Sequence, residues 1–142
     1  MNGVIIIDKP AGWTSHDVVG KLRRILGERR IGHGGTLDPM ATGVLPIFVG
    51  RATRAVQFCE AYEKEYIAGL KLGIETDTQD ITGTVLKRHE GELPQQDKLE
   101  QVLTMFMGEI EQVPPMYSAI KINGKKLYDL ARRGVEVERT AR

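Results

Sequence analysis

Residues 32–50, GHGGTLDPMATGVLPIFVG, hold a glycine-rich segment followed directly by an apolar run. Four glycines and one proline occur in residues 32–43, which predicts a loop with demanding backbone geometry. Residues 44–49 are continuously apolar, which is typical of a buried strand. The stretch therefore predicts a constrained loop that leads into a core strand.

The elements before this stretch are predicted from the same kind of pattern. Residues 4–7 form a short apolar run ended by DKPAG, which predicts another buried strand and a turn. Apolar residues from Val18 to Leu26 then recur at helical spacing, and we expect a helix capped by Ser15 and ended by Gly27.

The elements after the stretch are less regular. Residues 52–59 predict a short helix and residues 65–72 a strand, with residues 83–88 as its hairpin partner. A helical apolar stripe follows at residues 99–107, and a short amphipathic segment comes after Pro114-Pro115. Strands and helices without a strict βαβ rhythm favour an α+β fold with a mixed, mainly antiparallel sheet and flanking helices.

Composition bounds the class of protein. The chain has 142 residues, 41% hydrophobic and 27% charged, which suits about one domain with its own core. The net charge of +1 excludes a uniformly basic or acidic chain. Residues 1–54 carry 8 Lys+Arg against 4 acids, residues 55–115 carry 5 against 12, and residues 116–142 carry 7 against 3. The two basic regions would suit a polyanion if they share one side, although ordinary surface variation gives the same numbers.

Cysteine use and the N-terminus indicate a compartment. Cys59 is the single cysteine, so the chain has no internal disulfide, and three scattered histidines cannot complete a closed zinc site with it. The first ten residues hold an apolar run too short for a signal peptide or a membrane span. We expect a cytoplasmic protein without a membrane partner.

Two kinds of ligand motif fail on spacing. In the glycine-rich loop, Leu37 stands where a dinucleotide fingerprint needs its third glycine, and no Gly-Lys pair there completes a P-loop. In TDTQD, residues 76–80, a calcium loop counted from Asp77 would place Gln79, Ile81 and Arg88 at ligand positions. We therefore expect no nucleotide-binding motif in the loop and no metal at residues 76–80, which predict a hydrogen-bonded turn.

Asp38 is the candidate for chemistry in the loop. Pro39 biases it toward an extended conformation, and the nearby glycines let a ligand approach the backbone. A carboxylate held in this way could act as nucleophile or general base, although an Asp-Pro pair is also a common turn device.

Aromatic and basic residues interleave in a predicted strand and in the last segment. Aromatic rings stack on unpaired bases while Lys and Arg hold phosphates, which suits looped RNA. Tyrosines also fill cores, and lysines also solubilise surfaces. The residues concerned are Lys64, Tyr66, Tyr117, Lys121, Lys125, Lys126, Tyr128, Arg132 and Arg133.

Several motifs occur together in the order found in one family. They are NGVIIIDKPAGWTSHDVV, GHGGTLDPMATGVLPIFVG, KEYIAGLKLGIETDTQDITG and QVPPMYSAIKINGKKLYDLARRG, which span nearly the whole chain. The chain resembles the bacterial TruB-type tRNA pseudouridine synthases. The resemblance implies a pseudouridine synthase fold, no cofactor, and isomerisation of uridine 55 in the T-loop of tRNA, with the target base flipped out.

The resemblance also implies roles for single residues. The aspartate of the G-x-L-D-P motif, expected as a buried catalytic nucleophile, matches Asp38, and the tyrosine that packs on the target base matches Tyr66. The histidine that helps hold the opened T-loop matches His33, and Lys9-Pro10 resembles the element that buttresses the catalytic loop. The expected substrate-binding set is Tyr66, His33, Gly35, Thr36 and Lys9. The expected RNA-binding set is Lys21, Arg24, Lys121, Lys125, Lys126, Arg132 and Arg133. Attack at ribose C1′, attack at uracil C6 and a glycal-like route all remain open.

The chain differs from the family pattern in length. The resemblance implies a partial catalytic domain at residues 1–113 and a thumb-like RNA-binding insertion at residues 114–142. It also implies later strands, a basic residue that pairs with the nucleophile and a small C-terminal RNA-binding domain, which have no counterpart here. We expect a fragment, incomplete at its C-terminus, that self-associates through an exposed sheet edge or has reduced stability.

Two other functions compete with an RNA-modifying isomerase. A non-catalytic RNA-binding or RNA-chaperone fragment would use the basic segments without Asp38. A generic hydrolase would use Asp38 with His33, and would release free uracil.

Overall fold

The computed structural model describes residues 1–118, 120–122 and 124–141. The chain divides into two compact units, Met1–Ile67 and Ala68–Arg142, and each is considered by itself. No helix among the described residues has both the length and the apolar character needed to cross a membrane.

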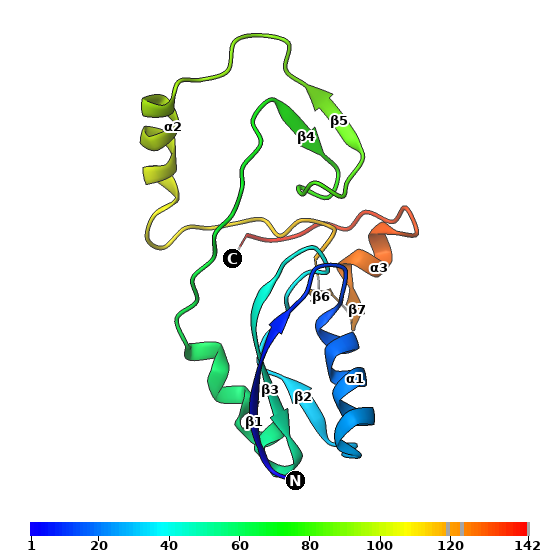
Figure 1. Cartoon of the computed structure of the whole chain (residues 1–142). Helices are drawn as coiled ribbons and strands as arrows, with labels where there is room; N and C mark the ends of the chain where they lie inside the picture. The colour runs from blue at the N-terminus through cyan, green and yellow to red at the C-terminus, as the bar shows by residue number, and fades with distance from the viewer. Residues whose placement is uncertain (119, 123, 142) are drawn as a thin grey trace. The chain divides into compact units, whose positions relative to one another are not determined.

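A three-stranded antiparallel sheet forms the centre of the first unit (Figure 1). Strand β3 (Gly43–Val49) lies between β1 (Gly3–Lys9) and β2 (Ile31–His33). The strands predicted at residues 4–7 and 44–49 are thus confirmed, and β2 is an addition. A strand of three residues is too short for its alternation to stand out in the sequence.

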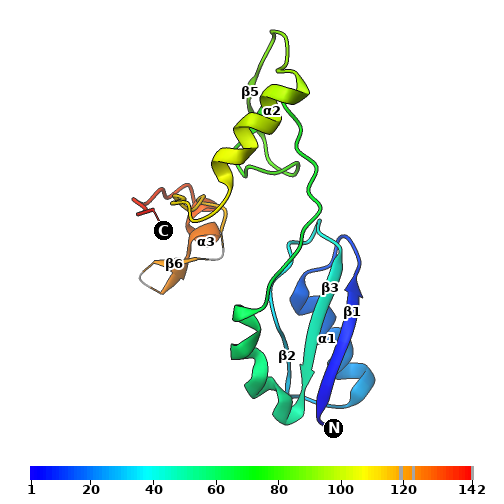
Figure 2. The same cartoon turned by 90° about the vertical axis from the view of Figure 1, so that its left-hand side faces the viewer.

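Helix α1 (Ser15–Leu26) covers one face of this sheet (Figure 2). Val18 and Val19 of the helix pack with Leu45 and Ile47 of β3, and all four side chains are buried. The helical spacing of its apolar residues predicted this contact, because the apolar stripe must face a core.

The opposite face of the sheet is apolar but partly open. Val4, Ile6 and Val44 are 53%, 60% and 71% exposed, so the burial predicted for residues 4–7 and 44–49 is wrong at these three positions. Phe48, which pairs with Val4 across the ladder, is buried on this face beside the 3-10 helix η1 (Gly50–Ala61). The short helix predicted at residues 52–59 is found as this 3-10 helix.

The cap of α1 differs from the prediction. Thr14 is the N-cap, since its hydroxyl accepts from the backbone of Asp17 and the Asp17 carboxylate accepts from the Thr14 backbone. This reciprocal pair is a capping box, which satisfies two free N–H groups at the helix start. Ser15 is the first helical residue and is buried. Gly27 ends the helix in the left-handed conformation, as predicted.

The second unit begins with a hairpin of β4 (Ile74–Thr76) and β5 (Val85–Arg88). The returning strand was predicted, but its partner was not. Residues 65–72 form no strand, because a strand needs a neighbour for its hydrogen bonds and none of the described residues pairs with them. The turn at residues 76–80 is confirmed as hydrogen-bonded: Asp80 accepts from Thr78 and Thr82, and Asp77 accepts from the Thr84 backbone.

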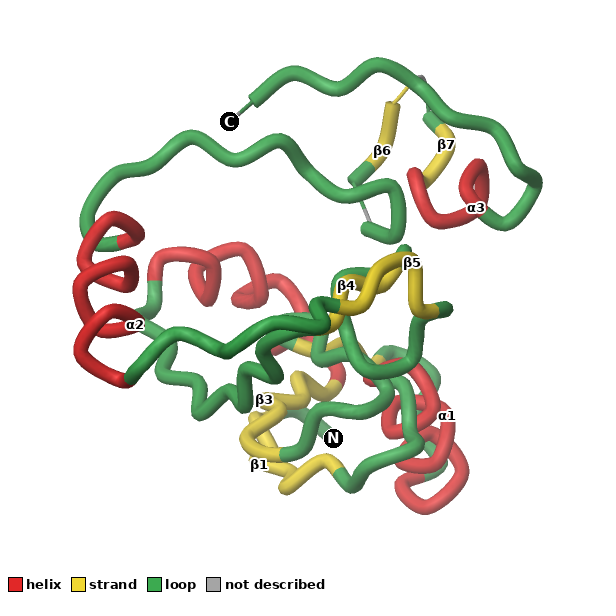
Figure 3. The backbone as a smooth tube through the Cα atoms, turned by 90° about the horizontal axis from the view of Figure 1, so that it is seen from above, coloured by secondary structure: helices red, strands yellow, loops and turns green. Residues whose placement is uncertain are grey.

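The rest of the second unit consists of short helices, a small hairpin and loops (Figure 3). Helix α2 (Gln96–Leu103) runs into the 3-10 helix η2 (Thr104–Phe106), and no residue of either is buried. Strands β6 (Lys121–Ile122) and β7 (Lys125–Lys126) form a small hairpin before α3 (Leu127–Ala131), whose Leu127 is fully buried. The described elements form an α+β fold with antiparallel sheets, as predicted.

Candidate active site

Asp38 lies in the loop between β2 and β3, residues 34–42, which we call the Asp38 loop. The carboxylate side chain is exposed rather than buried, which corrects the expectation of a buried nucleophile. Its backbone carbonyl accepts from the Ala41 N–H at 3.0 Å, which closes a turn over Pro39. An exposed carboxylate on a defined turn can reach a substrate that comes to the protein surface.

The residue before Asp38 is held by α1. The Leu37 N–H donates to Ser15 Oγ at 2.9 Å, and the Ser15 hydroxyl donates to the Leu37 carbonyl at 3.3 Å. The Leu37 side chain is partly buried and packs against the core cluster. Both the backbone and the side chain of Leu37 are therefore fixed.

The residue after Asp38 is held by the turn that follows β1. The Pro39 carbonyl accepts from the Gly12 N–H at 2.7 Å and from Lys9 Nζ at 3.3 Å. The same ammonium donates to the carbonyls of Pro10 at 2.9 Å and Trp13 at 2.6 Å. Lys9 is fully buried, and its three donors go to three carbonyls, so this geometry suits it for holding the loop.

The start of the Asp38 loop needs glycine for reasons of space. The Gly34 N–H donates to the Pro46 carbonyl at 2.8 Å, and a Cβ at Gly34 would lie 2.8 Å from the Phe48 ring and 3.2 Å from Cys59 Sγ. Only a residue without a side chain fits this contact. The glycine-rich pattern thus reflects close packing at this position.

His33 stands at the end of β2, beside the loop. Its Nδ1 lies 2.6 Å from the Gly35 carbonyl. A carbonyl oxygen only accepts, so Nδ1 carries a proton and donates this hydrogen bond. Gly35 has φ +154°, and Gly35 and Thr36 are both exposed next to Asp38.

Tyr66 lies outside this cluster of contacts. Its ring is 66% exposed on the extended segment that follows η1. Among the described residues, no hydrogen bond joins Tyr66 to Asp38 or His33. The structure therefore brings together Lys9, His33, Gly35 and Asp38 through the loop, and leaves Tyr66 on a separate segment.

A shallow hollow lies on α1 beside the Lys9 anchor. It has a volume of about 560 Å³ and includes Trp13, His16 and Arg24 in its lining. Lys21 and Arg24 are exposed on this helix, as the sequence predicts. The Asp17 carboxylate also lines the hollow, so the Trp13 ring lies with groups of both charges there.

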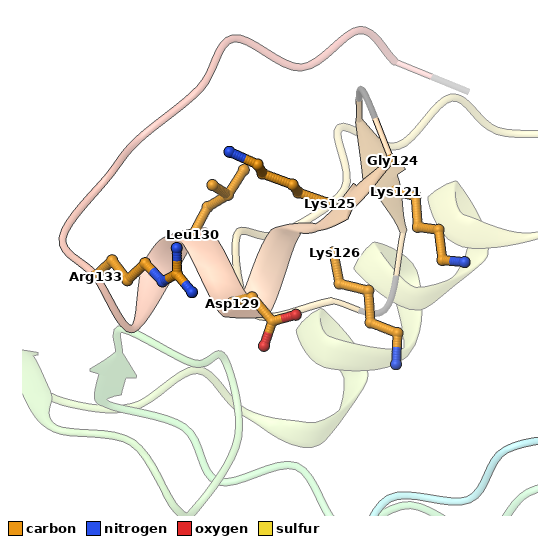
Figure 4. A pocket seen from close by; sticks show the side chains of 7 residues that line it. All are labelled: Lys121, Gly124, Lys125, Lys126, Asp129, Leu130 and Arg133. Atoms are coloured by element: carbon orange, nitrogen blue, oxygen red, sulfur yellow. The ribbon is translucent and has the colours of Figure 1, made fainter.

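A second basic hollow, of about 350 Å³, lies in the second unit (Figure 4). Its cations are Lys121, Lys125, Lys126 and Arg133, and Asp129 lies between the Arg133 and Lys126 side chains. Four cations around one carboxylate leave a positive surface.

The Tyr128 ring is in contact with two cations next to this hollow. Lys126 Nζ lies 5.1 Å and the Arg132 guanidinium 5.3 Å from its centroid. Lys126 also donates to Tyr128 Oη at 2.8 Å, and this bond is the main reason that the pKa of Lys126 is raised above 10.5. Tyr128 thereby orders two of the predicted RNA-binding side chains.

Three residues that hold the Asp38 loop were not assigned this role from sequence: Ser15, Gly12 and Gly34. A signal for Ser15 was present, because Thr14 and Asp17 have the spacing of a capping box. Once Thr14 is the cap, the Ser15 hydroxyl is available for another partner. No local pattern identifies that partner as Leu37, which is 22 residues away.

Comparisons with known proteins show the family of this chain. Residues 23–142 match the family model described as TruB family pseudouridylate synthase (N terminal domain). The chain is 53% identical over 142 residues to tRNA pseudouridine synthase B of Geotalea uraniireducens (strain Rf4), which covers 100% of this chain and 46% of that protein. It is also 53% identical to the protein of the same name from Clostridium kluyveri, of which it covers 49%. The chain thus spans about half the length of the curated relatives it matches.

Solved structures show the same fold. A Cbf5-Nop10-Gar1 complex matches with a TM-score of 0.56 and 38% identity, over 84% of this chain and 31% of that chain. An H/ACA RNP bound to a substrate RNA containing 2'-deoxyuridine matches with a TM-score of 0.51 and 33% identity, over 85% and 34% of the two chains. With the family model covering most of its length, this chain belongs to the TruB family of pseudouridylate synthases.

Proposed function

We propose that this chain forms the catalytic half of a tRNA pseudouridine synthase that isomerises uridine 55 in the T-loop, with Asp38 as the nucleophile. The observation that carries the proposal is an exposed Asp38 carboxylate between two anchored neighbours, Leu37 and Pro39. The relatives named tRNA pseudouridine synthase B support the same activity.

The reaction needs no external reagent. The bond between ribose C1′ and uracil N1 breaks, a bond between C1′ and C5 forms, and the hydrogen of C5 leaves as a proton while N1 gains one. Atoms and electrons therefore balance without a redox partner or cofactor. Asp38 can assist by adding to ribose C1′, by adding to uracil C6, or by removing a proton on a glycal-like route, and each requires a carboxylate held at a fixed place.

The target base has to leave its stack before Asp38 can reach it. Flipping a nucleotide outward costs a few kcal/mol of stacking and pairing. The exposed ring of Tyr66 is available to stack on the flipped base, and the His33 side chain stands at the loop to hold the opened RNA. Gly35 and Thr36 leave the backbone accessible beside Asp38, and Lys9 holds the loop from behind.

Basic side chains in both units would bind the phosphates of the T-arm. Lys21 and Arg24 on α1 belong to the catalytic domain that we assign to residues 1–113. The cations on the segment we assign as the thumb, residues 114–142, are Lys121, Lys125, Lys126, Arg132 and Arg133. Phosphate contacts of this kind position an RNA, and the shape of the opened loop supplies specificity.

The second candidate is an RNA-binding fragment without catalysis. It is favoured by the basic hollow at Lys121, Lys125, Lys126 and Arg133, which does not involve Asp38. The two functions differ in whether the Asp38 carboxylate is needed.

The test is release of tritium from a T-arm stem-loop that carries uridine labelled at C5, using the complete gene product that contains this chain. We expect Asp38→Ala to lose about a thousandfold or more in rate, with RNA affinity within about twofold of wild type. Glu90→Gln, which changes an exposed carboxylate elsewhere, is the matched control and should react like wild type. Equal rates for the two variants would refute the proposal. RNA binding without tritium release from wild type would favour the binding fragment, and release of free uracil would favour a hydrolase.

A further inference from the structure

Ser15 has a hydroxyl that its own helix does not use. It occupies the first turn of α1, where a serine often serves as the cap, but Thr14 and Asp17 already form the capping box. Ser15 is only 3% exposed, so its hydroxyl has no access to bulk water. A buried hydroxyl needs a partner inside the protein.

That partner is the backbone of the residue next to Asp38. Ser15 Oγ accepts from the Leu37 N–H at 2.9 Å and donates to the Leu37 carbonyl at 3.3 Å. One side chain thus satisfies both backbone groups of Leu37, as a neighbouring strand would. The Leu37 carbonyl belongs to the peptide group that leads into Asp38, so its orientation limits where the Asp38 side chain points.

The Ser15 contact and the Pro39 contacts have different origins. Pro39 is held through its carbonyl by Gly12 and Lys9, which belong to β1 and the turn after it. Leu37 is held by α1. The Asp38 backbone therefore has one anchor on each side, and loss of the Ser15 anchor frees the peptide group before Asp38 while the one after it stays held.

We propose that Ser15 is a positioning residue for the isomerisation, acting through the Leu37 backbone to hold the Asp38 carboxylate at its reacting position. This inference rests on the proposed function, in which Asp38 is the nucleophile. Displacement of a reacting group by about 1 Å can cost about a hundredfold in rate. Ser15 touches neither RNA nor base in this role, so its effect falls on the chemical step.

The experiment compares Ser15→Ala with Thr14→Ala in the complete gene product. Thr14→Ala removes the capping box at the same helix end without touching Leu37, so it controls for a weakened helix. We expect Thr14→Ala to lower Tm by about 2 °C and to keep kcat within about twofold of wild type. We expect Ser15→Ala to lower kcat by about 10- to 100-fold with KM for the T-arm within about twofold.

Hydrogen exchange at the Leu37 amide gives a readout that does not depend on activity. Exchange should rise about tenfold or more in Ser15→Ala and stay unchanged in Thr14→Ala. A Ser15→Ala enzyme with the kcat of Thr14→Ala overturns the inference, even if Leu37 exchange rises. An inactive wild-type protein refutes the proposed function and the catalytic part of this inference together. Exchange at Leu37 still decides in that case whether Ser15 holds the loop.

Discussion

Replacing the buried Lys9 ammonium should destabilise the first unit by a measurable amount. Lys9→Met keeps an unbranched side chain that is one atom shorter at this fully buried position and removes three donors. The Pro39 carbonyl keeps its bond from Gly12, so two carbonyls, of Pro10 and Trp13, lose the side-chain partner. An unsatisfied carbonyl costs about 1–3 kcal/mol, and water reaches these two exposed residues, so the lower figure applies to each. The relieved desolvation of the ammonium offsets part of these roughly 2 kcal/mol, so we expect a net loss of about 1 kcal/mol.

Urea unfolding followed by the fluorescence of Trp13 measures this loss, because Trp13 is the single tryptophan and lies in the first unit. Lys21→Met is the matched control, since Lys21 is an exposed lysine on α1, and it should change the free energy of unfolding by less than about 0.5 kcal/mol. Equal unfolding midpoints for the two variants would refute the reasoning. Such a result would mean that the Lys9 bonds only offset the cost of burying its charge.

Three further outcomes follow from local geometry. Gly34→Ala should lower the free energy of unfolding in urea by about 1–3 kcal/mol, because the new Cβ meets the Phe48 ring. Gly20→Ala, the control, has open space in a helix and should raise it by about 0.5–1 kcal/mol. Equal effects of the two variants would contradict the packing argument. The Thr14 hydroxyl and backbone hold the pKa of Asp17 below 3.8, so its contribution to stability is present above that pH and is lost as pH falls through the lowered pKa. Asp17→Asn should therefore reduce the change in urea midpoint between pH 5 and pH 2. A pH dependence equal to that of wild type would count against this explanation. Ile6→Lys, on the open sheet face, should reduce self-association in light scattering of the 142-residue chain, and a wild-type chain that is already monomeric would disprove association through this face.

Sequence patterns were sufficient where the deciding interactions are local. The apolar runs at residues 4–7 and 44–49 predicted strands, and glycine and proline predicted a loop at residues 32–43, of which the structure forms residues 34–42 as the Asp38 loop between β2 and β3. The turn at residues 76–80 was also predicted, because Asp and Thr side chains bond to a backbone only a few residues away.

The patterns failed where the structure of a segment depends on contacts with residues distant in sequence. Residues 65–72 alternate like a strand but pair with no strand among the described residues. Alternation shows which side chains share one face, but it does not show whether another strand lies beside them. The burial predicted for residues 4–7 also depends on what covers each face of the sheet, and α1 covers one face only.

The sequence by itself determined the family, the Asp38 candidate and the constraints of its loop, because each depends on residue types at short spacing. Only the tertiary structure decided how that loop is held. Ser15 reaches Leu37 across 22 residues and Lys9 reaches Pro39 across 30, and the carboxylate between them is exposed rather than buried. These contacts arise because β1 is a strand of the sheet and α1 packs on one face of it, which brings together side chains and carbonyls that no local pattern connects.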